Sequence, residues 1–224
     1  MRFSAVLFDV GNTLLDVPDD PHERALRAVS HIGSVSLKRY KSEIERARTE
    51  WLESGGAPHV ADLAETWIGH SKRALDLAGF LGDRELAAQL IEKHFLADGW
   101  EVFSEAEGVL RELRRQGIPM GIVSNWPATL EATLRDAGLR GFFEAVVVSG
   151  VVGYAKPHPK IFRLALERLG VLPEQTLFVG DSLEDDVKGA QAVGMPSILI
   201  DRRRRHGEHR DRIETLRELL DFMA

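Results

Sequence analysis

The chain of 224 residues is 44% hydrophobic and 29% charged, so it can bury a sizeable core without metal or disulfide staples. It has no cysteine, which excludes disulfides, cysteine nucleophiles and thiolate metal sites and is compatible with a cytoplasmic location. The net charge of −6 disfavours a broad nucleic-acid surface, and no apolar stretch approaches the roughly 18 residues of a membrane helix, so we expect neither nucleic-acid nor membrane partners.

Five short apolar runs are each followed by turn or polar residues, a pattern that predicts buried strands. They cover residues 5–8, 118–123, 145–148, 176–179 and 196–200. Helical patterns lie between and after the later runs, over residues 105–116, 127–137, 159–169, 184–193 and 212–222. Strands that alternate with helices predict an α/β fold, a Rossmann-like parallel sheet with helices on both faces.

Residues 17–99 interrupt this alternation, because they contain no strong strand pattern and their apolar residues recur at intervals of three and four. Leu26 with Val29, and Leu86 with Leu90, show that spacing. We therefore predict about four helices inserted after the first strand. In this interpretation residues 1–16 and 100–224 form the core domain, and residues 17–99 form an all-helical second domain.

Polar residues gather after the predicted strands, at the edge where parallel sheets bind ligands. They are Asp9 after the first strand, Ser124 and Asn125 after the second, Lys156 after the third, and Asp181, Asp185 and Asp186 after the fourth. Clustered carboxylates repel one another unless a cation joins them. Because Mg²⁺ prefers oxygen ligands and also accepts a substrate phosphate, we expect Mg²⁺ at this edge.

These four elements, in this order, resemble the motifs of the haloacid dehalogenase superfamily, and the inserted helices resemble the helical C1 cap of its subfamily I. The resemblance implies that Asp9 is the nucleophile, which attacks phosphorus and forms an aspartyl-phosphate. It implies that Ser124 binds the phosphate and that Lys156 steadies Asp9 and the phosphoryl oxygens. It also implies a set of metal ligands: Asp9, the backbone carbonyl of Gly11, Asp181 and Asp186.

Several of these positions also have simpler interpretations. Asn125 and Trp126 are expected to bind substrate together with Ser124 and Lys156, but serine and asparagine also cap helices, and a tryptophan also packs in cores. Asp186 is preferred over Asp185 as the acid that serves the metal only because of its spacing to residues 189–190. The arginine run 202–205 could grip an anionic substrate or nucleic acid, although a solvated surface loop is the expected interpretation.

Gly11 departs from the pattern that the resemblance predicts. Phosphatases of the superfamily usually carry an aspartate two residues after the nucleophile, where it serves as general acid and base. The dehalogenase branch lacks this aspartate, whereas some sugar-phosphate phosphatases of the superfamily have Asp-x-Gly-Asn, as this chain does from Asp9 to Asn12. Asp16 or His22 could supply the missing proton.

We therefore expect a Mg²⁺-dependent phosphatase that acts on a small phosphorylated metabolite, as a monomer or a homodimer. One alternative is a 2-haloacid dehalogenase, in which Asp9 attacks carbon. It is disfavoured by Gly11, where that branch has a tyrosine, and by the acid-rich segment after Gly180. The other alternative is a non-catalytic binding protein, which is disfavoured because clustered charges are costly to keep without a use.

Overall fold

The computed structural model describes residues 3–16, 23, 26–27, 29–53, 63–97, 100–126 and 128–223. The chain divides into two compact units, Met1–Asp16 with Glu101–Ala224 and Val17–Trp100. The roles of core and cap stay predictions. Within the described ranges, no helix is both long enough and apolar enough to span a membrane.

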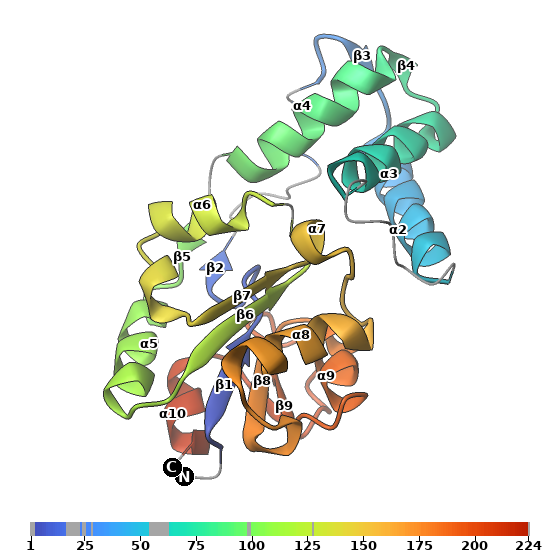
Figure 1. The fold of residues 1–224 in the computed structure, drawn as a ribbon. Coiled ribbons are helices and arrows are strands. Elements are labelled where there is room, and N and C mark those ends of the chain that lie inside the picture. The colour runs from blue at the N-terminus through green and yellow to red at the C-terminus, as the bar shows by residue number, and fades with distance from the viewer. Residues whose placement is uncertain are drawn as a thin grey trace. The chain divides into compact units, whose positions relative to one another are not determined.

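The first unit is built on a six-stranded parallel sheet, with the strand order β10-β9-β8-β1-β6-β7 (Figure 1). Its strands are β1 Ala5–Phe8, β6 Met120–Ser124, β7 Ala145–Val148, β8 Thr176–Gly180, β9 Ser197–Ile200 and β10 Arg212–Ile213. All residues of β1, β6, β8 and β9 are buried, which explains why they read as continuous apolar runs in the sequence. The predicted α/β fold is confirmed.

Strand β1 is central, because it pairs with β6 on one side and with β8 on the other. Val6 lies opposite Met120 in one neighbour and Leu177 in the other. The residues that follow β1, β6 and β8 therefore emerge next to one another at one edge of the sheet. This placement depends on the strand order and not on side-chain chemistry.

Helices cover both faces of the sheet (Figure 1). Helices α8 and α9 pack together on one face, where Ile161 and Phe162 of α8 contact Leu7 and Phe178 in one buried cluster. Helices α5 and α10 contact each other and not that cluster. The helices of this unit are α5 Ala106–Arg115, α6 Leu130–Asp136, α7 Ser149–Val152, α8 Pro159–Leu169, α9 Gly189–Gln191 and α10 Arg217–Met223.

Two predicted helices differ from the structure. The helix expected over 212–222 starts only at Arg217, because Arg212 and Ile213 instead extend the sheet by pairing with Leu199 and Ile200. The helix expected over 184–193 opens as a wider π-helical turn, η4 Leu183–Lys188, before α9. Periodicity alone does not separate a π turn from an α turn over so few residues.

Two further short strands, β2 Leu15–Asp16 and β5 Glu101–Val102, pair antiparallel in the same unit. Leu15 lies opposite Val102, and the Phe103 N–H donates a hydrogen bond of 3.1 Å to the carbonyl of Leu14. The chain therefore leaves the first unit and returns to it through one paired ribbon.

The second unit contains the helices α2 Leu37–Glu53, α3 Leu63–Ala78 and α4 Arg84–Ala97. It is not all-helical as predicted, because β3 Gly33–Ser34 pairs antiparallel with β4 Leu81–Gly82. Glycine permits this pairing: a Cβ on Gly33 would lie 2.3 Å from the Phe80 ring. Tyr40, Leu75 and Phe80 form the buried centre of this unit.

Candidate active site

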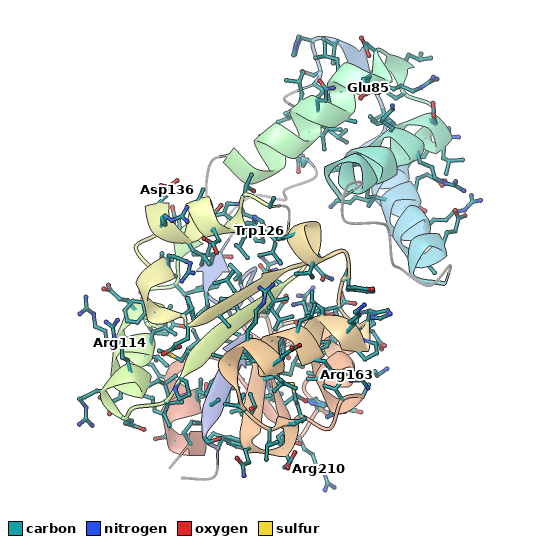
Figure 2. The ribbon with its side chains drawn as sticks, in the orientation of Figure 1. Glu85, Arg114, Trp126, Asp136, Arg163 and Arg210 are labelled. Carbon is teal, nitrogen blue, oxygen red and sulfur yellow. The ribbon has the colours of Figure 1, made fainter. Side chains whose placement is uncertain are left out.

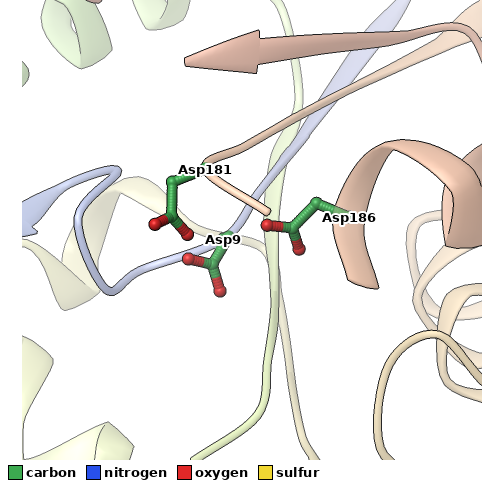
Figure 3. Close-up of side chains that lie close together, drawn as sticks. All are labelled: Asp9, Asp181 and Asp186. Atoms are coloured by element: carbon green, nitrogen blue, oxygen red, sulfur yellow. The ribbon is translucent and has the colours of Figure 1, made fainter. Parts of the chain in front are cut away.

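Three carboxylates meet at the carboxyl edge of the sheet (Figure 3). Asp9 follows β1, Asp181 follows β8, and Asp186 comes from η4. One carboxylate oxygen from each residue lies within 4.8 Å of the others. Asp185, next to Asp186, does not belong to this group.

Lys156 joins two of these carboxylates. Its Nζ lies 2.6 Å from Asp9 Oδ1 and 2.5 Å from Asp186 Oδ1. Lys156, Asp9 and Asp186 are 2%, 6% and 1% exposed, so the three charges are held almost without solvent. Buried charges are tolerated only when they are paired and hydrogen-bonded, and each of these charges depends on the others.

Ser124 and Thr13 complete the surroundings of the Asp9 carboxylate. Ser124, the last residue of β6, donates a hydrogen bond of 3.1 Å from Oγ to Asp9 Oδ1. The Thr13 hydroxyl lies 3.5 Å from Oδ2. Two strong donors therefore hold Oδ1, whereas Oδ2 has only this long contact with a protein donor among the described residues. Thr13 is a site residue that the sequence analysis did not identify.

The side-chain amide of Asn125 forms two hydrogen bonds with the backbone of Lys156. Its Nδ2 donates to the Lys156 carbonyl at 3.0 Å, and its Oδ1 accepts from the Lys156 N–H at 2.7 Å. This pair of bonds fixes the segment that carries the lysine to the end of β6. Both functional groups of the amide are engaged in this way, so the structure gives Asn125 a positioning role.

Trp126 comes two residues after β6 (Figure 2) and is buried, with 5% of the residue exposed. Its backbone N–H donates to Ser149 Oγ at 3.1 Å, and its carbonyl accepts from the Gly150 N–H at 2.9 Å. These bonds connect the end of β6 to α7. The structure thus displays packing at this position, and the predicted contact with substrate stays a prediction.

The local structure of η4 directs the Asp186 side chain toward Lys156 and the other two carboxylates. The Val187 N–H bonds to the Ser182 carbonyl five residues back, which is the hydrogen bond of a π turn. The Ser182 N–H donates to Asp186 Oδ2 at 2.9 Å, so the second carboxylate oxygen is also satisfied. Gly180 makes room for this side chain, because a Cβ there would lie 2.4 Å from Asp186 Cγ.

The electrostatics of the cluster oppose full ionisation. Burial, together with repulsion from Asp9 and Asp186, raises the pKa of Asp181 to about 7. Burial also raises the pKa of Asp186 to about 6, although the ion pair with Lys156 opposes that rise. Burial alone would lower the pKa of Lys156, but attraction to Asp186 and Asp9 outweighs it and raises that pKa. A hard divalent cation would relieve this repulsion, and carboxylate oxygens at this spacing fit Mg²⁺.

Arg203, Arg204 and Arg205 are exposed, as expected for a solvated surface loop, but Arg202 is not. Its guanidinium donates to the Thr13 carbonyl at 2.7 Å and the Asn12 carbonyl at 3.1 Å, and it forms an ion pair with Glu105 at 2.6 Å. It also stacks over the Phe103 ring, 3.4 Å from the centroid. This residue ties the loop after β9 to the segment that follows Asp9. In the sequence it is indistinguishable from its arginine neighbours.

A family profile and several known proteins match this chain. A profile described as haloacid dehalogenase-like hydrolase matches residues 3–194. The chain is 30% identical over 238 residues to glyceraldehyde 3-phosphate phosphatase of Methanopyrus kandleri, covering 98% of this chain and 96% of the relative. It is 31% identical over 198 residues to phosphoglycolate phosphatase of Yersinia pestis, covering 83% of this chain and 85% of the relative.

Solved structures with the same fold include a HAD hydrolase and a dehalogenase. A putative HAD hydrolase from Bacillus subtilis, bound to magnesium, superposes with a TM-score of 0.77 at 26% identity and covers 100% of this chain and 99% of that one. The L-2-haloacid dehalogenase of Xanthobacter autotrophicus superposes with a TM-score of 0.71 at 21% identity, covering 99% and 98%. At 21% identity, the similarity to the dehalogenase supports a shared fold and nothing further.

Proposed function

This chain belongs to the haloacid dehalogenase-like hydrolases, and we propose that within this family it is a Mg²⁺-dependent phosphatase of small phosphorylated metabolites. The observation that carries the proposal is the Asp9 carboxylate, held at the end of the central strand by Lys156 and Ser124 and flanked by Asp181 and Asp186. The glyceraldehyde 3-phosphate and phosphoglycolate phosphatases to which the chain is similar support the same reaction class.

In this proposal Asp9 attacks the phosphorus of a phosphate ester. An Asp9 oxygen forms a bond to phosphorus while the bond from phosphorus to the leaving alcohol breaks, which gives an aspartyl-phosphate. Water then attacks that intermediate, releases inorganic phosphate and restores the Asp9 carboxylate. Lys156 and Ser124 orient the nucleophile and offer donors to the phosphoryl oxygens, where negative charge develops.

Asp9, Asp181, Asp186 and the Gly11 backbone carbonyl would hold the metal. When bound, Mg²⁺ neutralises charge on the phosphoryl oxygens. The three carboxylates fit such an ion, because Lys156 supplies only one positive charge against them. Asp186 takes part through its position beside Lys156 and Asp181, whereas Asp185 lies outside the cluster.

Gly11 supplies no proton to the leaving alcohol. We propose that the enzyme therefore favours esters whose leaving groups need little protonation, such as aryl, acyl or anomeric phosphates. Asp16 is the described candidate for a substitute acid, since it lines the same cavity as Asn12 and Asp181. His22, the other candidate from the sequence, lies outside the described residues.

We further propose that residues 17–99 act as a cap that closes over the site of a core formed by residues 1–16 and 100–224. Closure would exclude water during phosphoryl transfer and provide contacts that select the substrate. The paired ribbon of β2 and β5 joins the two units and would act as the hinge region. The cytoplasmic location and the monomeric or homodimeric state also stay predictions.

A substrate screen tests the proposed function. Phosphate esters, including p-nitrophenyl phosphate, are incubated with the protein in Mg²⁺ and in EDTA, and released phosphate is measured. Metal-dependent turnover of several esters is the expected result. Chloride release from 2-chloropropionate without metal would instead establish the dehalogenase, and no reaction with either class would favour the binding protein.

A further inference from the structure

A cavity of about 260 Å³ lies beside the carboxylate cluster. Asn12 and Asp181 line it on the side of the candidate active site, and Arg203 and Arg205 line it from the loop after β9. All of these residues belong to the same compact unit. The cavity therefore connects the candidate site to the arginine run that the proposed reaction does not use.

The loop that carries these arginines is held in place by its own buried carboxylate. Asp201, 4% exposed, accepts hydrogen bonds from the backbone N–H groups of Arg205 at 2.8 Å and His206 at 2.7 Å. Arg202, at the start of the loop, donates hydrogen bonds to the carbonyls of Asn12 and Thr13 and so fixes the loop to the segment after β1. The arginines are thus presented by an ordered backbone.

Three of the six arginines from Arg202 to Arg212 already have an acidic partner. Arg202 pairs with Glu105, and Arg204 and Arg212 both pair with Glu214. Arg203 and Arg205 differ, because within the described part of the chain neither guanidinium has an ion pair or a hydrogen-bond acceptor. Arg210 also has no such partner among the described residues, but it does not line the cavity, whereas Arg203 and Arg205 are the two exposed arginines that do.

The acids of the cavity do not supply the missing partners. The Asp201 carboxylate already binds backbone N–H groups, and Asp181 belongs to the carboxylate cluster. Asp16 is the remaining acidic side chain that lines the cavity, and its single negative charge cannot balance both Arg203 and Arg205. A planar guanidinium fork matches a carboxylate or a phosphate with two parallel hydrogen bonds.

We propose that Arg203 and Arg205 form a subsite for a second anionic group, a carboxylate or a phosphate, on the leaving group of the substrate. The proposal rests on the proposed phosphatase function and narrows its substrate class to short esters with two anionic ends. A cavity of about 260 Å³ is at the lower limit of ordinary ligand pockets, which suits a leaving group of few carbon atoms.

The test uses the full chain with Asp9→Asn, which blocks turnover, and measures binding by calorimetry in excess Mg²⁺. The probes are 2-phosphoglycolate, ethylene glycol bisphosphate and 2-hydroxyethyl phosphate. The first two carry a second anionic group, and the third carries a hydroxyl in its place. Arg203→Gln with Arg205→Gln should weaken binding of a charged probe about tenfold or more, and binding of the hydroxyl probe by less than about twofold.

Arg204→Gln is the matched control, because Arg204 lies between the two residues but pairs with Glu214. It should leave the affinity for all three probes unchanged. A loss for 2-phosphoglycolate alone assigns the subsite to carboxylates, and a loss for the bisphosphate alone assigns it to phosphates. Equal changes for all three probes, or no measurable binding of either charged probe, overturn the subsite. Turnover of p-nitrophenyl phosphate by the wild type tests the phosphatase separately.

Discussion

Charged side chains are arranged differently at the buried carboxylate cluster and in the loop that follows β9. At Asp9, Lys156 and Asp186 the charges are buried and directly paired, so removal of one group leaves another without compensation. In the loop from Asp201 to Arg212 most charges are exposed, and single pairs there contribute little to stability. The buried charges at the first region therefore behave as one unit, whereas the charges of the loop are nearly independent groups on a fixed backbone.

The largest effect is expected for Asp9→Asn in the buried region. The substitution keeps size and polarity, so the protein should remain folded, but it removes the nucleophile and should lower kcat by about 10⁴-fold or more. Phosphate release and a thermal melt measure both properties. Asp185→Asn is the control, since Asp185 lies outside the cluster. More than a few per cent of residual turnover would place the nucleophile elsewhere.

Lys156→Met tests whether the buried charges form one unit. It leaves Asp9 and Asp186 without their shared cation, and loss of one partner from a buried ion pair costs about 3–5 kcal/mol in the free energy of unfolding. Urea denaturation at pH 8 measures this change. Lys188→Met, which removes an exposed ion pair with Glu184, should change the same free energy by less than about 1 kcal/mol. Equal losses in both variants would contradict the comparison.

Gly11→Asp asks whether the buried region lacks a proton donor. If it does, wild-type rates should depend steeply on the pKa of the leaving alcohol, and the variant should hydrolyse alkyl phosphates up to about 10²-fold faster. Rates across esters with graded leaving groups measure the slope in both proteins. Equal, shallow slopes would mean that another group, such as Asp16, already donates the proton.

Metal binding should stabilise the protein more at pH 8 than at pH 5.5. Because the pKa values of Asp181 and Asp186 are raised to about 7 and about 6, the metal-free fold is favoured below the unfolded-state pKa near 4, and that advantage is lost as pH rises through 6 and 7. Mg²⁺ requires the ionised carboxylates. At pH 8 and 100 times its Kd, it should raise Tm by about 5–10 °C.

Differential scanning calorimetry with and without EDTA checks this shift. Asp181→Asn should lower the gain at pH 8, because it removes a carboxylate from the cluster. A Tm shift that is the same at both pH values would show that Mg²⁺ acts somewhere other than the carboxylates.

Arg202→Met should have the smallest of these effects and tests whether one arginine of the loop is more than an independent surface charge. Arg202 is the partly buried exception in the loop, with its side chain 15% exposed and paired to Glu105, which is 10% exposed. Its loss should cost about 1–2 kcal/mol in unfolding free energy, measured in urea. Arg204→Gln, at an exposed pair, should cost less than about 1 kcal/mol. If the two variants were equal, the anchoring role of Arg202 would be wrong.

The sheet and its edge could be predicted from the sequence, because strands buried on both faces read as apolar runs that stop abruptly. Asp9, Ser124 and Asp181 stand at such stops, so their meeting followed from the parallel order alone. Asn125 could not be interpreted in the same way, since its partner is the backbone of Lys156, far along the chain. No local pattern encodes such a bond.

The contacts of the arginines in the loop after β9 could not be predicted from the sequence. Residues 202–205 are identical in type, yet Arg202 is anchored, Arg204 is paired with Glu214, and Arg203 and Arg205 line a cavity. Those differences come from Glu105, Thr13 and Glu214, which only the folded chain brings near. Likewise, the short strand β10 replaced the start of a predicted helix because its partner β9 was available.

The π turn of η4 makes the length of that segment as much a functional constraint as its acids. A π turn holds one more residue than an α turn, and each residue of an α-helix advances about 100° around the axis. Because the turn is already widened by one residue, a further insertion within residues 183–185 would rotate Asp186 away from Lys156 while leaving every charged side chain of the site in the sequence. A relative that keeps all four motifs but is one residue longer here would have every charged residue of the site and yet an incomplete site.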